Sequence, residues 1–166
     1  MMLAKIPINN PGNIRISNEK FIGEVTPSSD AQFKQFSSMA YGYRAMFKIL
    51  DTYRNSYQLD TITEIISRWA PPAENDTTSY INSVSSSINI NPNQVLPYDQ
   101  DTTTRLVYAI SYHENGITPN MAEIQDGLKL AGTIELVKVA GGISIGVIIL
   151  VVAFLYINRK KTKHNG

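Results

Sequence analysis

The chain contains no cysteine and only two histidines, His113 and His164. Without cysteine there is no disulfide, no thiolate nucleophile and no cysteine-based zinc site, and the redox compartment stays open. Two histidines far apart in the sequence are too few for a histidine-rich metal site. We therefore expect no metal and no organic cofactor.

Charge is scarce as well. Asp, Glu, Lys and Arg make up 17% of the 166 residues, and the formal net charge is +1. A nearly neutral chain gives no general case for binding nucleic acid or an acidic surface. The exception is the tail, 158–166, which carries Arg159, Lys160, Lys161 and Lys163. The length fits one domain with an appendage.

One long run lacks charge altogether. Residues 139–157 are 19 consecutive uncharged residues, VAGGISIGVIILVVAFLYI. As a helix this run spans a hydrocarbon core of about 30 Å. Helices and closed barrels alone satisfy their backbone in lipid, so we expect one transmembrane helix. The chain then divides into a soluble domain at 1–131, a linker at 132–138, the membrane helix at 139–157 and the basic tail.

The membrane orientation has two opposing indications. The basic tail favours a cytoplasmic C-terminus, which places the domain across the membrane. The first eight residues hold no apolar stretch of signal-peptide length, and a tail-anchored protein normally leaves its domain in the cytoplasm. Both a virion membrane and the host inner membrane are open as locations. In a virion, the tail would contact the enclosed nucleic acid weakly by screening its phosphates.

Residues 1–131 read as mainly α, with a small β or turn segment at the N-terminus. Apolar spacing predicts helices over 39–54 and 61–69, a third capped by Asp76 or Thr77, and a short amphipathic helix over 121–130. Thr61 and Glu64 have the spacing of a capping box. Apolar residues among 14–22 predict one or two short strands, and Phe33 and Phe36 bracket a strand or turn.

A fourth helix carries the main candidate for chemistry. Asp101 is placed to cap it, and Asn115 with Gly116 tolerates the left-handed turn that ends it. Val107, Ile110 and Glu114 follow at spacings of three and four, so they share one face. A carboxyl group set toward an apolar surface keeps its proton more readily, as a general acid needs. The alternative is a solvated glutamate at a helix end, where the helix dipole disfavours it.

Several motifs occur together and in order: NNPGNIR at 9–15, FIGE at 21–24, GYRA at 42–45, RWAPPAENDT at 68–77 and HENG at 113–116. This set resembles the structural protein P5-like family of phage virion proteins. That family is linked to lysozyme-like enzymes that degrade peptidoglycan. The resemblance covers about residues 9 to 131. Its longest motif, RWAPPAENDT, is long enough to be specific to this family.

The end of the fourth helix also resembles the catalytic helix of lytic transglycosylases, where an Ala-Ile run precedes a Glu-Ser-Gly and a Pro. Ala109, Ile110, Glu114 and Pro119 match this pattern, whereas Asn115 replaces the serine. Ile117 likewise replaces an aromatic residue. In those enzymes the glutamate helix comes before the sheet, so the resemblance implies a circularly permuted lysozyme-like fold.

The resemblance implies roles for two carboxylates. Glu114 would protonate the glycosidic oxygen between two sugars of peptidoglycan. A lytic transglycosylase uses one carboxyl group as acid and then as base, whereas a hydrolase needs a second within several ångströms. Glu24 is the best candidate for that second group, and a strand-end residue at the surface is its alternative.

Six further residues are candidates for substrate binding. Trp69 either stacks on a sugar ring or anchors the core. Asn10, Asn13 and Asn75 either bond acetamido groups or hold turns. Glu74 contacts substrate or caps the next helix. Asn115 lies directly beside the acid.

Three functions follow from this pattern. The leading one is a membrane-anchored, virion-associated enzyme, a lytic transglycosylase or muramidase, that opens the cell wall as the phage genome enters. The alternative is a non-catalytic virion protein linking the membrane to capsid or vertex proteins. A third is a bacterial envelope protein that binds peptidoglycan without cutting it. Glu114 at the motif position favours the enzyme, and Asn115 and Ile117 favour the scaffold.

Overall fold

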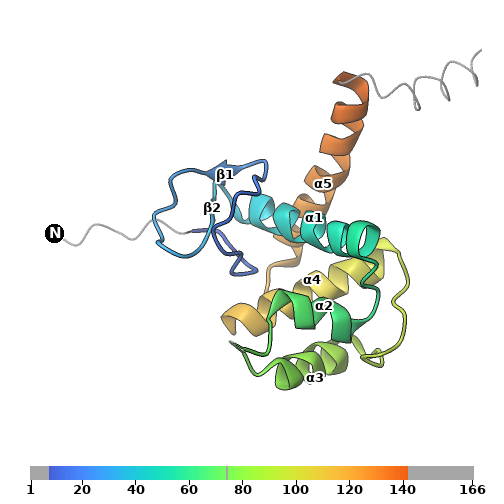
Figure 1. Ribbon diagram of the computed structural model, residues 1–166. Coiled ribbons are helices and arrows are strands. Elements are labelled where there is room, and N and C mark those ends of the chain that lie inside the picture. Colours follow the sequence, from blue (N-terminus) through green and yellow to red (C-terminus); the bar gives the residue numbers. More distant parts are fainter. Residues whose placement is uncertain (1–7, 74, 142–166) are drawn as a thin grey trace, which may run out of the picture. The chain divides into compact units, whose positions relative to one another are not determined.

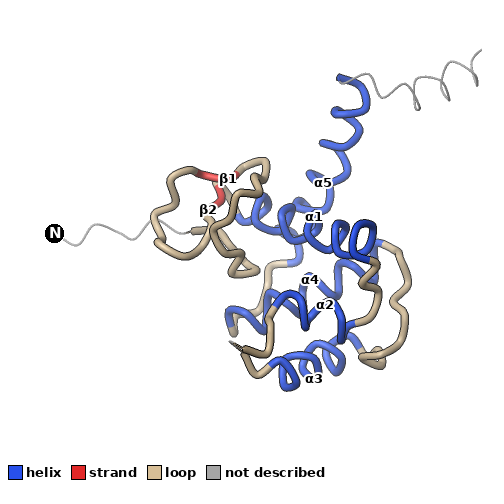
Figure 2. Tube along the Cα trace, viewed as in Figure 1, coloured by secondary structure: helices blue, strands red, loops and turns tan. Residues whose placement is uncertain are grey.

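Five helices and one two-stranded antiparallel sheet make up the described residues, 8–73 and 75–141, of this computed structural model (Figures 1 and 2). The expectation of a mainly α protein with a small β segment near the N-terminus is confirmed. The elements in order are β1 (Glu24–Val25), β2 (Gln35–Phe36), α1 (Met39–Tyr57), α2 (Ile62–Trp69), α3 (Thr77–Ile88), α4 (Gln100–Asn115) and α5 (Met121–Gly141). Contacts divide the chain into two compact units, Met1–Ala131 and Gly132–Gly166.

Each of the first three helices begins directly after a capping residue, which the sequence predicted for α2 and α3 but not for α1. Ser38 caps α1 by accepting from the backbone N–H of Tyr41. Thr61 and Glu64 form the predicted capping box at α2, and Asp76 caps α3. Helix α1 ends at Tyr57, three residues beyond the predicted Arg54. These side chains accept backbone N–H groups that have no partner within the helix.

Helix α4 differs from its prediction at the first turn. Its cap is Asp99, which accepts from the N–H of Thr102, so the assignment of the cap to Asp101 was wrong. Asp101 lies within the first turn and pairs with Arg105 at 3.6 Å. The predicted end is confirmed, because Gly116 has a positive φ of 64°. That conformation suits glycine, which has no Cβ to clash.

Helix α5 begins at Met121 as expected but continues to Gly141, through the residues predicted as a linker at 132–138. The predicted transmembrane run lies outside the described residues from 142 onward, as does the basic tail at 158–166. Within 8–73 and 75–141, no helix combines the length and apolar character needed to cross a membrane.

The core of the first unit lies between the helices, and α4 packs against both α1 and α3. Val107 and Ile110 of α4 are fully buried, as their spacing predicts, and Ile124 joins them from α5. Gly127 brings α5 close to α1, because a Cβ there would lie 2.6 Å from the Cβ of Tyr43. Burial of these apolar side chains is the main stabilising term for such a unit.

The segment before α1 folds onto that helix. Strand β1 pairs Glu24 with Phe36 of β2, and an isolated bridge joins Arg15 to Phe33. A strand was expected to include Phe21, but β1 begins after that residue, at Glu24. A small apolar cluster of Phe21, Phe36 and Ala45 fixes the sheet to α1.

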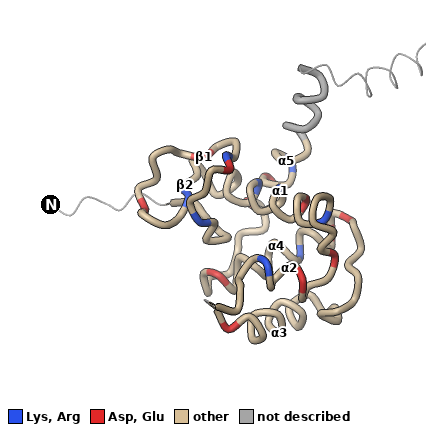
Figure 3. The backbone as a smooth tube through the Cα atoms, in the orientation of Figure 1, with Lys and Arg blue, Asp and Glu red and all other residues tan. Residues whose placement is uncertain are grey.

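Acidic and basic positions are interspersed through the first unit (Figure 3). Mixed charge of this kind presents no large field of one sign. Function must therefore be sought in particular side-chain arrangements.

Candidate functional site

The carboxylate of Glu114 is the point where three distant parts of the chain meet. Its Oε1 accepts hydrogen bonds from Trp69 Nε1 at 3.1 Å and from the Tyr80 hydroxyl at 2.8 Å. Its Oε2 accepts a bond from Asn13 Nδ2 at 2.9 Å. Glu114 is half-buried in the last turn of α4, so it lies between the core and solvent. Hydrogen bonds to an ionised acceptor are shorter and stronger than neutral ones.

Asn13 reaches Glu114 because of the turn in which it lies. Its φ is 46°, in the left-handed region that asparagine tolerates better than most residues. The turn is held by Asn10, whose Oδ1 accepts the N–H of Ile14 at 2.9 Å. Asn10 is buried, and its Nδ2 also donates to the carbonyls of Ile14 and Lys34, so it fulfils the turn-holding alternative.

Tyr80 comes to the site from the first turn of α3. Its ring is buried and stacks on His113, with ring centroids 3.6 Å apart. Burial, followed by the negative charge of Glu114, raises the pKa of Tyr80 far above its ordinary value. The hydroxyl therefore keeps its proton and serves Glu114 as a donor.

The structure supports the core-anchor alternative for Trp69, and stacking on a sugar ring stays a prediction. Trp69 packs against the main core cluster and meets the ring of Tyr53 edge to face, with centroids 6.4 Å apart. Its Nε1 nevertheless reaches Glu114, so the same side chain positions the carboxylate. Gly12 makes room for it, since a Cβ there would lie 2.8 Å from Trp69 Cζ2.

The pattern of donors leaves one acceptor position on Glu114. Each carboxylate oxygen has two lone-pair sites. Among the described residues, Oε1 receives two donors and Oε2 receives one. A proton carried by this carboxyl group would therefore lie on Oε2.

Glu114 opens onto a groove of about 410 Å³. Asn13, Trp69 and Asn75, all predicted from the sequence, line this groove. Sequence reasoning missed Arg15, Phe33, Ile49 and Tyr53, which also line it. Arg15 and Phe33 arrive through a long-range bridge that no local periodicity signals, whereas Tyr53 lies one turn beyond Ile49 on α1.

Glu24 is not among the residues that line this groove. Its carboxylate is paired with Lys34 at 3.1 Å, and the Lys34 side chain is only 1% exposed. A catalytic role for Glu24 stays a prediction. Burial alone would raise the pKa of Glu24. The Phe21 N–H and the Lys34 ammonium outweigh burial and hold the pKa below its ordinary value.

The remaining predicted residues have mixed placements. Asn75 donates to the carbonyl of Pro71 at 3.1 Å while lining the groove. Asn115 donates to the carbonyls of Pro11 and Ser111 at 2.8 and 3.0 Å, so it ties α4 to the N-terminal segment. Glu74 lies outside the described residues. In the described part of the chain, no group of three or more His, Asp or Glu side chains is placed to hold a metal ion.

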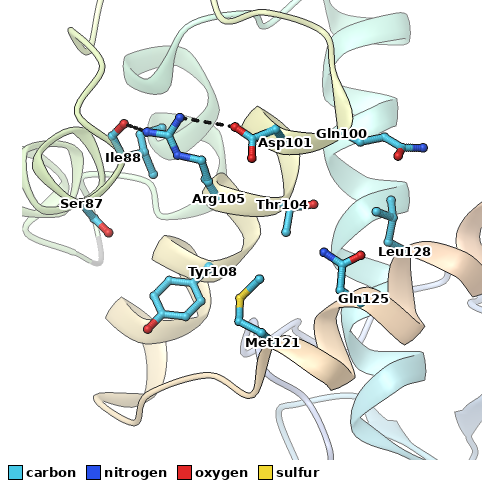
Figure 4. Close-up of a pocket in the computed structure, with 10 residues that line it drawn as sticks. All are labelled: Ser87, Ile88, Gln100, Asp101, Thr104, Arg105, Tyr108, Met121, Gln125 and Leu128. Carbon is cyan, nitrogen blue, oxygen red and sulfur yellow. Dashed lines mark hydrogen bonds and ion pairs between the residues drawn. The ribbon is translucent and has the colours of Figure 1, made fainter.

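A separate hollow of about 280 Å³ lies where α3, α4 and α5 meet (Figure 4). Its arginine, Arg105, is already engaged by Asp101 and by the carbonyl of Ile88. Asp101 is the one carboxylate among the lining residues. The groove at Glu114 is therefore the stronger candidate for chemistry.

No known protein-family profile matches the sequence. The chain is, however, similar to a protein called "Protein P5" from Pseudoalteromonas phage PM2. The two are 38% identical over 125 residues, which cover 73% of this chain and 77% of that protein. Similarity of this extent spans most of both chains.

Proposed function

The chain belongs to the family of protein P5 of phage PM2, and we propose that it is a bacteriophage virion protein that degrades peptidoglycan in the host cell wall. The observation that carries this proposal is Glu114, half-buried beside a groove and held by three donors. Donors fixed around a carboxyl group hold it in one orientation toward a bound substrate.

Glu114 is the proposed general acid. Its Oε2 proton passes to the glycosidic oxygen as the bond between that oxygen and the sugar C1 breaks. Asn13, Trp69 and Tyr80 hold the carboxylate that remains. A glycan strand lying along the groove would meet Oε2 at the acceptor position that the three donors leave open.

The groove favours a lytic transglycosylase over a muramidase. Among its described lining residues, Glu114 is the only carboxylate, since Glu24 is committed to Lys34. A single carboxyl group suffices when the C6 hydroxyl of the same muramic acid attacks C1 and returns its proton to Glu114. The product is then a 1,6-anhydro sugar, and no water is consumed. A muramidase would need a second carboxylate or a positioned water.

An anchor would confine this activity to one place. The uncharged run at 139–157 is the proposed membrane helix, in a virion membrane or the host inner membrane, followed by a tail with weak affinity for nucleic acid. Tethering raises the effective concentration of the enzyme at the wall without any new contact.

The second candidate is a non-catalytic virion protein that links the membrane to capsid or vertex proteins. Ile117, which stands where the related enzymes have an aromatic residue, is 72% exposed and contributes nothing to the groove. The donors around Glu114 also join the N-terminal segment to three helices, as a structural residue would.

The enzyme and the non-catalytic virion protein are distinguished by a turbidity assay, in which the full chain in detergent clears a suspension of purified Gram-negative peptidoglycan or leaves it unchanged. We expect the wild type to clear the suspension and Glu114→Gln to be slower by about a hundredfold or more, because the amide has no acidic proton. Asp126→Asn, in an exposed ion pair of α5, is the matched control and should keep full activity. Anhydro ends in the products identify a transglycosylase, and reducing ends identify a muramidase. If the wild type is folded but never clears the suspension, both the transglycosylase and the muramidase proposals are rejected.

A further inference from the structure

A larger groove adjoins the one at Glu114. It has a volume of about 880 Å³ and shares Ile49, Tyr53 and Pro71 with the first groove. The shared residues place the two grooves side by side along α1 and the end of α2. A branched ligand held at Glu114 would therefore extend into the second groove.

The second groove is lined by an arginine that lies against two tyrosine rings. The guanidinium carbon of Arg68 lies 3.7 Å from the ring centroid of Tyr57 and 5.3 Å from that of Tyr53. Tyr53 and Tyr57 are one helical turn apart on α1, and Arg68 lies in the last turn of α2. A guanidinium held over aromatic faces is attracted by the ring electrons. Arg68 also hydrogen-bonds the Tyr53 side chain, and its remaining N–H groups can donate to a ligand.

The charge of Arg68 has no carboxylate partner among the described residues. Its neighbour four positions earlier, Glu64, is committed to the capping box and accepts from the Thr61 hydroxyl at 2.8 Å and the Thr61 N–H at 3.1 Å. Those bonds, the one from the Thr61 hydroxyl first, lower the pKa of Glu64, so it stays an acceptor within α2. A planar, stacked arginine is suited to a carboxylate, which it binds with two parallel hydrogen bonds.

We propose that the second groove binds the peptide stem of a glycan strand, with Arg68 holding a stem carboxylate. This inference rests on the proposed function, which places the sugar backbone beside Glu114. Peptide stems branch from the muramic acid at the scissile bond, so a stem must leave the first groove close to where the chain is cut. Two carboxylates, Glu19 and Glu64, line the same groove as Arg68, and Glu64 is already engaged by Thr61. A stem with a diamino acid carries both an amino group and carboxylates, so it offers Glu19 a positive partner and Arg68 a negative one.

The test compares two soluble ligands. One is a set of peptidoglycan strands with intact stems, and the other is the same strands after an amidase has removed the stems. Binding of both to the full chain in detergent is measured by calorimetry, in a Glu114→Gln background that prevents cleavage. We expect the intact strands to bind about tenfold tighter, the effect of one charge-assisted hydrogen-bonded pair.

Arg68→Gln should bind both ligands with the affinity of the stripped strands, and Arg68→Lys should recover part of the preference because it keeps the charge but not the planar fork. Lys129→Gln removes one positive charge from an exposed ion pair of α5 and should leave the preference unchanged. Thermal unfolding of each variant verifies that it is folded.

The outcomes separate this inference from the proposed function. Equal binding of both ligands, or a preference that survives Arg68→Gln, overturns the stem site, while clearing by the wild type would leave the enzyme intact. A stem preference that depends on Arg68, in a protein whose wild type never cuts the strand, supports the stem site and rejects the lytic activity. Absence of binding to either ligand overturns both.

Discussion

Asn13 and Glu114, which lie 101 residues apart in the sequence, are joined by one amide group that donates twice. Asn13 Nδ2 is 2.9 Å from Glu114 Oε2 and 3.1 Å from the Glu114 carbonyl oxygen. The candidate acid therefore depends on a turn near the start of the chain as much as on its own helix.

Removal of this amide should weaken both the fold and the site. Asn13→Gly deletes the side chain but keeps a residue that adopts the positive φ of 46°. We expect a loss of about 1–2 kcal/mol in the free energy of unfolding and a clear fall in wall clearing. Denaturant unfolding and clearing rates measure the two effects. Unchanged clearing would show that the orientation of Glu114 does not depend on Asn13.

The hydroxyl of Tyr80 should matter more to turnover than to substrate binding. Tyr80→Phe keeps the stack on His113 and removes one of the two donors at Glu114 Oε1. We expect kcat to fall by about tenfold with KM nearly constant, because the carboxylate left after proton transfer loses one stabilising bond.

Tyr43→Phe is the matched control for this prediction. The Tyr43 hydroxyl is also buried, but it bonds Ser111 at 3.3 Å instead of Glu114. We expect this variant to lose stability and to keep its kcat. Equal kinetic losses in the two variants would indicate a general loss of rigidity and would contradict a specific role for Tyr80.

The Glu24–Lys34 ion pair predicts how stability depends on pH. The folded pKa of Glu24 lies below its ordinary value of 4.5, so its contribution to stability is complete above that value and is lost as pH falls through the folded pKa. Glu24→Gln should cost about 3–5 kcal/mol at pH 7, since it leaves the buried Lys34 ammonium without a carboxylate and with only the carbonyls of Ser17 and Glu19 to stabilise its charge. The difference between wild type and variant should shrink below about pH 4.5. Chemical denaturation at several pH values measures it, and a constant difference would refute the assignment.

Room for Trp69 depends on Gly12. Gly12→Ala places a Cβ 2.8 Å from Trp69 Cζ2, which forces the indole away from its present position. We expect slower clearing, because the Trp69 bond to Glu114 lengthens, together with a stability loss of about 1–3 kcal/mol. Gly132→Ala, where an added Cβ meets nothing within 4 Å, is the control and should behave like the wild type. Full activity in Gly12→Ala would mean that Trp69 does not position the acid.

The helices were predictable because their signals are local. The apolar spacing of α1, the Thr61 and Glu64 capping box and the glycine after α4 each act within a few residues. The cap of α4 was misassigned because Asp99 and Asp101 are both capable acceptors, and only the backbone conformation distinguishes them.

The site itself was only partly predictable. Glu114 and Trp69 were identified through motifs, but nothing in the sequence shows that Trp69 donates to Glu114. Sequence reasoning could not choose between the two alternatives for Glu24, because a carboxylate in a turn gives no sign of its partner. Its partner, Lys34, is fully buried. Lysine side chains are seldom buried in proteins, so the sequence offers no reason to expect this ion pair.

Trp69 is also the only tryptophan of the chain, and its indole nitrogen bonds the carboxylate at the centre of the proposed site. Indole emission depends on the polarity and charge around the ring. The protein therefore contains a built-in optical probe of Glu114. Binding of a ligand in the groove, or replacement of that carboxylate, should change the intrinsic fluorescence without any label, and no second tryptophan adds background to the signal.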